Sequence, residues 1–268
     1  MKLDFYIVHT FTEKIFSGIP VFVIPLDNWL SEGVMQKIAK ENTGISTVYF
    51  VQNTHGYYVR WFMHDKELTL SCPGAIAVCH ILKTVLHYTK DKVNLYTRAG
   101  TLDVNVRSSS AIRNNFYTLN LASKPADTFE MPKKIQKQLY AELIQAVKSK
   151  DLFLILKKED DLLNIEINNY AGIKDELEFD KLFLTVRGYN DSVKARCFSF
   201  NSGINEIPIA NLALCTLIPY WSKKLDKKEI QVTQLSEPYI SFVCRHNADN
   251  VSISANAKTY SVGSIYTR

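Results

Sequence analysis

The stretch LTLSCPGAIAVCHILK, residues 68–83, combines a polar turn with an apolar run that is long enough for a helix. Pro73 suits the first turn of a helix, where its missing N–H is not needed, so the sequence predicts a helix from there to about His87. The run is apolar almost all round through Leu82, which favours burial among strands. The free N–H groups at its start can hold an anion, so Ser71-Cys72-Pro73-Gly74 is a candidate binding turn.

A second stretch follows the same plan. NSGINEIPIANLALCTLIPYW, residues 201–221, gives a turn, a proline and another apolar helix, which we expect to start at Pro208 and to end near Trp221. Short β-branched and aromatic runs surround both helices. This duplication predicts an α+β fold of two similar domains, each with strands wrapped round a central apolar helix. An anionic ligand would then fit a cleft between the two helix N-termini.

The predicted strands and linker set the domain boundaries. A surface helix is expected at 31–42 and an amphipathic helix at 131–149, while the polar ASKPADTFEMP, residues 122–132, is the predicted linker. We therefore expect one domain at 1–122 and a second at 123–256, with the last strand, about 257–268, packing back on the first. The strands are predicted at 5–9, 21–24, 47–51, 57–63, 93–96, 102–106, 116–121, 152–156, 181–186, 195–200, 230–234, 240–245, 250–254 and 258–262.

Composition narrows the class of protein. The 268 residues are 46% hydrophobic and carry a net charge of only +5, with lysine pairs interleaved with acids as on solvated helix faces rather than on a nucleic-acid surface. No apolar stretch approaches the ~20 residues that cross a membrane. The five cysteines form no CxxC pair and predict reduced, buried thiols in a cytoplasmic protein. No phosphate loop or zinc spacing is present, so we expect neither a cofactor nor a metal.

Four stretches, in order, resemble one known family. They are FSGIPVFVI (16–24), MQKIAKENTGISTVYFV (35–51), YYVRWFMHDKELTLSCPGAIAVCHIL (57–82) and CFSFNSGINEIPIANLALCTLIPYW (197–221). The chain resembles the PhzF family of phenazine-biosynthesis-like isomerases, which share the diaminopimelate epimerase fold. The resemblance implies a cofactor-independent isomerase that acts on a small organic molecule, and it suggests a homodimer.

The departures from the family concern its catalytic residues. The proton-shuttling glutamate falls at Ser46, the histidine at Pro73, the aspartate at Ile207 and the serine at Leu212. A proton shuttle needs a carboxylate that can take and return a proton, and a serine hydroxyl needs an adjacent base. Glu41 matches a framework glutamate of the family, so we expect it to face elsewhere.

Two hypotheses follow, and the sequence leaves open whether the protein is an enzyme. The first is a pseudoenzyme, which keeps the fold and binds a small molecule or acts as a scaffold. The second is an altered isomerase or cyclase, of the kind found in secondary-metabolite biosynthesis, whose mostly apolar cleft works by orientation and desolvation.

The candidate catalytic residues are weak. Cys72 is either a reactive thiol at a helix start or a buried spectator, because the family cysteine falls one residue earlier, at Ser71. Ser46 and His9 are the other candidates, and His64 is expected in a surface turn. The turn at 201–203 is either ordinary or a donor of ligand hydrogen bonds. The predicted ligand-binding residues are Ser46, Ser71, Cys72, Pro73, Gly74, Asn201, Ser202, Gly203, Ile207 and Leu212.

Overall fold

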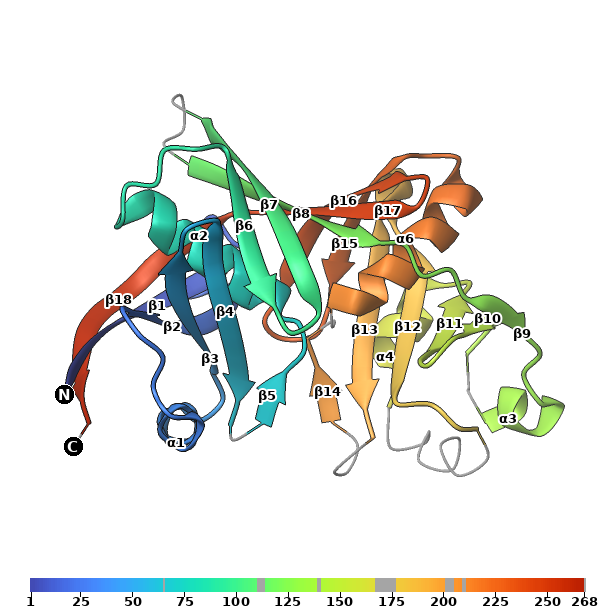
Figure 1. Ribbon diagram of the computed structural model, residues 1–268. Coiled ribbons are helices and arrows are strands. Elements are labelled where there is room, and N and C mark those ends of the chain that lie inside the picture. Colours follow the sequence, from blue (N-terminus) through green and yellow to red (C-terminus); the bar gives the residue numbers. More distant parts are fainter. Residues whose placement is uncertain are drawn as a thin grey trace. The chain divides into compact units, whose positions relative to one another are not determined.

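The computed structural model describes residues 1–268 except 65, 110–113, 139–140, 167–176, 201–204, 209–210 and 268. The chain divides into two compact units: unit 1 comprises Met1–Asn120 and Ile253–Arg268, and unit 2 comprises Leu121–Ser252. No helix among the described residues is long and apolar enough to cross a membrane. Figure 1 labels the elements of both units.

Unit 1 is a sheet folded around a helix. Its ladder runs β18-β1-β2-β3-β4-β6-β7-β8, with β2/β3 and β4/β6 parallel, the other pairs antiparallel, and the short β5 added to β4. The strands are β1 (Lys2–Thr10), β2 (Ile19–Leu26), β3 (Ser46–Asn53), β4 (Gly56–Met63), β5 (Lys66–Leu68), β6 (Lys92–Thr97), β7 (Gly100–Ser109), β8 (Asn114–Ala122) and β18 (Ala257–Tyr266).

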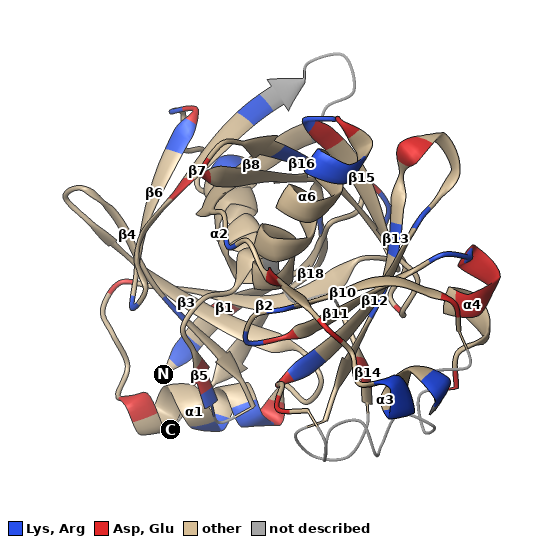
Figure 2. Cartoon of the chain, turned by 90° about the vertical axis from the view of Figure 1, so that its right-hand side faces the viewer, with Lys and Arg blue, Asp and Glu red and all other residues tan. Residues whose placement is uncertain are grey.

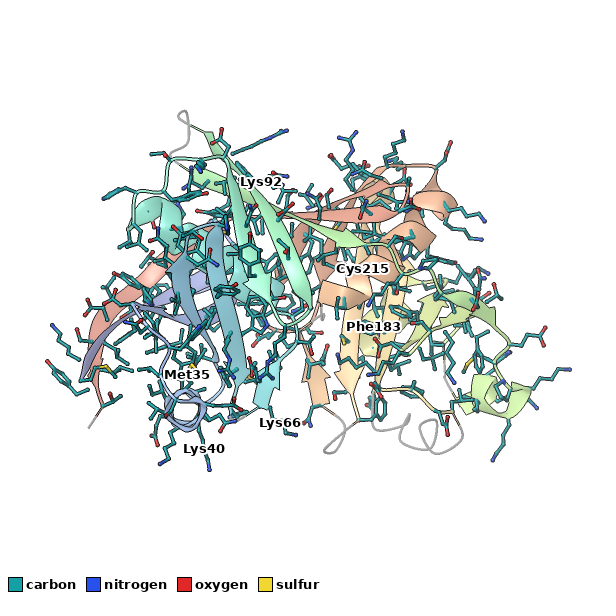
Figure 3. The ribbon with its side chains drawn as sticks, in the orientation of Figure 1. Met35, Lys40, Lys66, Lys92, Phe183 and Cys215 are labelled. Atoms are coloured by element: carbon teal, nitrogen blue, oxygen red, sulfur yellow. The ribbon has the colours of Figure 1, made fainter. Side chains whose placement is uncertain are left out.

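Two helices cover opposite faces of this sheet. α2 (Cys72–Thr84) is buried from Cys72 to Leu82 except at Pro73, and it packs against β1, β2, β3, β7 and β18, which confirms the predicted buried helix. α1 (Glu32–Glu41) turns Met35 and Ala39 into a separate apolar cluster on the other face (Figure 3). Charged residues colour α1 in Figure 2, whereas most of α2 is uncharged, as expected from their surroundings.

Unit 2 repeats this order of elements. Its strands are β9 (Asp127–Phe129), β10 (Leu143–Lys148), β11 (Leu152–Leu156), β12 (Lys181–Arg187), β13 (Val193–Ser199), β14 (Asn205–Ile207), β15 (Glu229–Gln234), β16 (Ile240–Asn247) and β17 (Asn250–Ala255). Its helices are α3 (Lys133–Gln138), α4 (Glu159–Asn164), the 3₁₀ turn η2 (Tyr189–Asp191) and α6 (Asn211–Leu225). The largest described apolar cluster of this unit lies between the sheet and the segments around α3 and α4.

The pairing pattern shows that the units are duplicates. From β1 to β7, successive neighbours pair antiparallel, parallel, antiparallel, parallel and antiparallel. The same five steps recur from β10 to β16. α1 and α4 each follow the second strand of the series, and α2 and α6 each follow the short strand, β5 or β14. The predicted α+β fold of two similar halves is therefore confirmed.

The helix predicted at 131–149 is wrong over its second half. A helix covers Lys133–Gln138, but Leu143–Lys148 is strand β10, which pairs with β9 and β11. All five residues of β11 are buried, so an antiparallel neighbour completes its hydrogen bonds inside the unit. That tertiary pairing outweighs the helical periodicity of the sequence. β9 also lies within the segment that the sequence presents as a linker.

The second apolar helix differs from its prediction at its C-terminal end. It is described from Asn211, since residues 209–210 lie outside the described part of the chain, and it continues through Pro219 to Leu225 rather than ending near Trp221. An internal proline normally weakens a helix. Here the buried Trp221 donates its indole N–H to Thr185 Oγ1 at 3.1 Å, and this contact with β12 holds the last turns in place.

Candidate functional site

The first turn of α2 is capped by its own sequence. The Gly74 N–H donates to Ser71 Oγ at 3.1 Å, and the Ala75 N–H donates to the Ser71 carbonyl at 2.9 Å. Cys72 is buried. A Cβ on Gly74 would lie 3.2 Å from Trp61 Cε3, so the glycine lets the helix start close to β4. The turn predicted from Ser71-Cys72-Pro73-Gly74 is thus a tightly packed helix N-terminus.

Ser46 shares a face of the sheet with α2. It opens β3 and pairs in parallel with Val21, which in turn pairs with Val8, so these three residues point to one side. Thr47 points to the other side, where its hydroxyl accepts from Asn42 Nδ2 at 3.1 Å just after α1. Ser46 is only 7% exposed, so the position that the resemblance gives to the shuttling glutamate is a buried hydroxyl.

His9 belongs to the opposite face. It follows Val8 in β1, and alternation turns its ring away from the side that Ser46 occupies. The ring stacks on Tyr260 with centroids 5.0 Å apart, and Phe16 packs edge-on against Tyr260. Burial lowers the pKa of His9, partly offset by a hydrogen bond to the Ser17 backbone. The fold therefore does not bring His9 and Ser46 together as base and nucleophile.

The candidates in unit 2 are partly visible. Ile207 ends β14 opposite Cys197 of β13, and it is partly exposed. Leu212 lies in the first turn of α6 and is 44% exposed. Asn201, Ser202 and Gly203 lie outside the described residues.

A partly buried ion pair stands before α2. Arg60 of β4 donates from Nε and from one Nη to the two oxygens of Glu67 of β5, at 2.8 and 2.6 Å. Glu32 of α1 forms a further ion pair with Arg60, and Arg98 forms one with Glu67, each at 2.9 Å. The guanidinium carbon of Arg60 lies 5.4 Å from the ring centre of Phe62, which is directly opposite Glu67. Two parallel hydrogen bonds and a cation–π contact make this a specific arrangement.

Unit 2 contains the same arrangement before α6. Arg196 of β13 donates from Nε and Nη to the two oxygens of Glu206 of β14, at 2.8 and 2.9 Å. Ser236 Oγ adds a hydrogen bond to Glu206 at 2.6 Å. The guanidinium carbon lies 5.0 Å from the ring centre of Phe198, which is opposite Glu206. Duplication has therefore preserved a side-chain constellation as well as a topology.

These pairs determine what the two glutamates can do. Glu67 and Glu206 each stand five residues before the first described residue of a helix, Cys72 in α2 and Asn211 in α6. The arginine hydrogen bonds hold the pKa of both carboxyls below its usual range. A carboxylate held in two arginine hydrogen bonds is a poor base, because it must give up that pair to accept a proton.

The sequence carries a signal for these pairs, although neither arginine was among the predicted site residues. Arg60-Trp61-Phe62 and Arg196-Cys197-Phe198 repeat an Arg-x-Phe pattern, and a glutamate follows each shortly before the helix. Glu41, by contrast, is exposed at the end of α1, and His64 is exposed in the turn after β4.

The remaining titratable groups of interest are buried and neutral in character. All five cysteines are buried and none forms a disulfide, as predicted, and burial raises the pKa of the Cys215 thiol to about 11. His80 of α2 is hydrogen-bonded to Tyr117 and to Thr259, each at 3.0 Å, and burial lowers its pKa to about 4. Within the described ranges, no three histidine, cysteine, aspartate or glutamate residues gather as metal ligands.

Comparison with known proteins identifies relatives that match most of the length of the chain. The model of a family described as "Phenazine biosynthesis-like protein" matches residues 8–239. The chain is 27% identical to an uncharacterized isomerase of Pseudomonas aeruginosa over 265 residues, which cover 99% of both chains. It is also 27% identical to the human phenazine biosynthesis-like domain-containing protein, over 95% of this chain and 92% of that one.

Solved structures show the same architecture. A phenazine biosynthesis protein of the PhzF family from Enterococcus faecalis superposes with a TM-score of 0.89 at 26% identity, covering both chains completely. A putative PhzC/PhzF protein from Clostridium difficile gives 0.87 at 27% identity, over 99% of this chain and 100% of that one. A predicted epimerase of P. aeruginosa gives 0.73 at 11% identity, over 99% of this chain and all of its own, and shows a shared fold alone. The epimerase-like fold expected from the sequence is confirmed.

Proposed function

The chain belongs to the phenazine biosynthesis-like protein family, and we propose that it binds a small organic molecule without the glutamate-driven proton transfer of an isomerase. One observation carries the proposal. The residue at the shuttle position, Ser46, is a buried hydroxyl on the α2 face of the sheet. The glutamates that precede the two helices, Glu67 and Glu206, are both held by arginine.

The chemistry of an isomerase explains why this arrangement matters. Moving a proton from carbon to carbon requires a group that is a base in one step and an acid in the next. A serine hydroxyl does this only with a base beside it. His9 lies on the opposite face of the sheet from Ser46, and Pro73, Ile207 and Leu212 offer no titratable group at the other positions.

The ligand that suits this protein is anionic. The described first turns of α2 and α6 contain no acidic residue, so the positive end of each helix dipole is uncompensated there. A carboxylate on the ligand would complement such a helix start. A cytoplasmic homodimer completes the proposal, in keeping with the resemblance and with five cysteines that form no disulfide.

An altered isomerase or cyclase is the second candidate. Leu212 is 44% exposed and Ile207 is partly exposed, so the apolar replacements are not absorbed into the core. Exposed apolar side chains can orient and desolvate a substrate. The relative from P. aeruginosa is also described as an isomerase.

Native mass spectrometry of freshly purified protein, compared with its denatured mass, is the first test. We expect a discrete small molecule that is released on denaturation, and its mass gives the compound class to assay. A protein that is empty and that binds no compound of a small-acid library would contradict ligand binding and favour a scaffold.

The proton-transfer part is tested in deuterated water. The released ligand, or cyclohexadiene and amino-acid candidates, is incubated with the protein, and mass spectrometry follows deuterium incorporation. We expect none above a protein-free control. Protein-dependent incorporation that survives Cys72→Ala would contradict the loss of proton transfer and support the altered enzyme.

A further inference from the structure

A cavity of about 860 Å³ opens in unit 1, where β1 begins and β2 ends. It is bordered by the first residues of β1, by the loop that follows β2, by the β3–β4 hairpin, and by Leu86, which comes two residues after α2. A cavity of this size can hold a small molecule. No predicted ligand-binding residue among those that the structure describes lines it.

The cavity is separate from the turn that starts α2. Phe50 lines it from the same face of β3 as Ser46, but four residues later, which is about 13 Å along a strand. α2 itself keeps Cys72 and Thr84 about 18 Å apart by helical rise. The cavity therefore lies towards the C-terminal end of α2, where the helix dipole is negative, and not at the N-terminal end that suits an anion.

Aromatic side chains line the cavity at two depths. Phe50 and Tyr57 are only 3% and 7% exposed, and their rings meet edge to face, with centroids 5.9 Å apart and planes at 80°. Trp29, which is 39% exposed, and the partly exposed Tyr6 line it nearer the surface. Several aromatic rings around one cavity are typical of sites that bind alkylated cations.

Carboxylates stand at the same cavity. Asp4 and Asp27 both line it, and neither forms an ion pair with a residue in the described part of the chain. The Ser264 hydroxyl donates to Asp4 Oδ1 at 2.9 Å and so holds that carboxylate in place. The two aspartates therefore supply negative charge beside the aromatic rings, where a cation would be attracted by both.

Positive groups also border the cavity. The Met1 ammonium donates to the Thr267 carbonyl, so its charge is partly satisfied within the chain. Lys2 is exposed, and its long side chain can turn its ammonium group towards water. Lys2 therefore weakens the attraction for a cation without closing the cavity.

We propose that this cavity binds a small molecule through an alkylated ammonium group, with the cation among the aromatic rings and close to Asp4 and Asp27. An alkylated ammonium loses little hydration on entering an aromatic site, and it keeps the attraction to ring faces and carboxylates that a neutral molecule lacks. The site does not depend on the proposed anion site, because no described residue belongs to both.

Titration calorimetry tests the requirement for charge. The probes are choline and its uncharged isostere, in which carbon replaces the nitrogen. Because the two have the same shape, we expect choline to bind at least about tenfold more tightly. Lys2→Gln should strengthen the binding of choline and leave the isostere unchanged, since it removes a like charge. Equal affinities for both probes, or no binding of choline, tetramethylammonium or phenyltrimethylammonium at about 10 mM, would overturn the proposal.

Tryptophan fluorescence tests the location. The other two tryptophans, Trp61 and Trp221, are 1% and 2% exposed, so a change in emission on adding choline is expected to come from Trp29. Trp29→Leu should abolish that change. An emission change that persists in Trp29→Leu would place the cation elsewhere and contradict the proposed site.

Substitutions in the loop after β2 test the contacts without disturbing the core. Trp29→Leu and Asp27→Asn should each weaken choline binding at least about fivefold in calorimetry. Tyr58→Leu is the matched control, because Tyr58 is 47% exposed beside Tyr57 on β4 but does not line the cavity. Wild-type affinity in both loop variants, or an equal loss in Tyr58→Leu, would refute the assignment.

Vesicles distinguish a free molecule from a lipid headgroup that carries the same cation. Phe50 and Tyr57 lie below the surface, so we expect no cosedimentation with phosphatidylcholine vesicles under conditions in which choline binds. Cosedimentation that Asp27→Asn abolishes would overturn the assignment to a free small molecule.

Discussion

His80 lies in the middle of α2 with both ring nitrogens hydrogen-bonded inside unit 1, to Tyr117 of β8 and to Thr259 of β18. Burial is the main cause of its lowered pKa, about 4, and the nearby Lys258 adds to it. Neutral histidine is therefore the form that fits the fold. A single residue thus joins the central helix to two strands that are distant in sequence.

His80 makes stability depend on pH. Between about pH 6.5 and 4 the unfolded chain binds a proton at His80 that the folded chain does not, so the free energy of unfolding rises with pH in this window. The contribution is complete above about pH 6.5 and is lost as the pH falls through about 4, a difference of about 3 kcal/mol. Urea unfolding across this range should show a shallower dependence for His80→Gln. His55→Gln, in an exposed turn, should keep the wild-type slope, and equal slopes in all three proteins would contradict the assignment.

Cys72 is expected to behave as a buried thiol. It is 1% exposed, and the other four cysteines are buried as well, so a thiol reagent should react slowly with the native protein and with five groups after denaturation. Colour development with a disulfide reagent measures both rates. One fast-reacting thiol that disappears in Cys72→Ala would instead identify a reactive cysteine at the start of α2.

At the scale of elements, the two Arg–Glu pairs fix a short strand against a long one just before each apolar helix. Arg60 and Glu67 join β4 to β5, and Arg196 and Glu206 join β13 to β14. A short strand of three residues has few backbone hydrogen bonds of its own, so the side-chain pair supplies much of its attachment. The start of each helix is positioned through this attachment.

Arginine geometry should matter more than charge at these sites. Lysine keeps the charge but cannot form two parallel hydrogen bonds to one carboxylate. Arg60→Lys and Arg196→Lys should each lower the free energy of unfolding by about 1–3 kcal/mol, measured by urea unfolding. Arg187→Lys is the control, because Arg187 pairs with Asp191 at the surface, where such a change costs about 0.5 kcal/mol or less. Equal losses at all three arginines would show that the two pairs are ordinary surface pairs.

The elements also show how far the sequence could be interpreted. The periodicity of α1 and the all-apolar run of α2 sufficed to place both helices. β10 could not be identified, because its helical pattern is overridden by pairing with the buried β11. The end of α6 was missed because the anchoring of Trp221 on Thr185 is a contact between residues far apart in the chain. The sequence therefore predicts the elements that local forces determine, and it does not predict those that depend on tertiary contacts.

At the scale of the whole molecule, duplication allowed the fold to be predicted, whereas the site depends on individual residues. A chain 26% identical superposes with a TM-score of 0.89, because strand order and apolar pattern tolerate many substitutions. A catalytic site tolerates few substitutions. Whether the protein is an isomerase therefore depends on the four changed positions, Ser46, Pro73, Ile207 and Leu212. The sequence indicated these positions, and its repeated Arg-x-Phe pattern marks the two arginines, but strand register is needed to see which glutamate each arginine reaches.

The place of β18 has a consequence for how the protein is made. Unit 1 contains Met1–Asn120 and also Ile253–Arg268, with the whole of unit 2 between them in sequence. During translation, β1 and His80 leave the ribosome long before their partners in β18 have been synthesised. The unit that is begun first is therefore completed last. A premature stop before residue 257 would remove β18 from the first-made unit, leaving β1 with an open edge on the nascent chain.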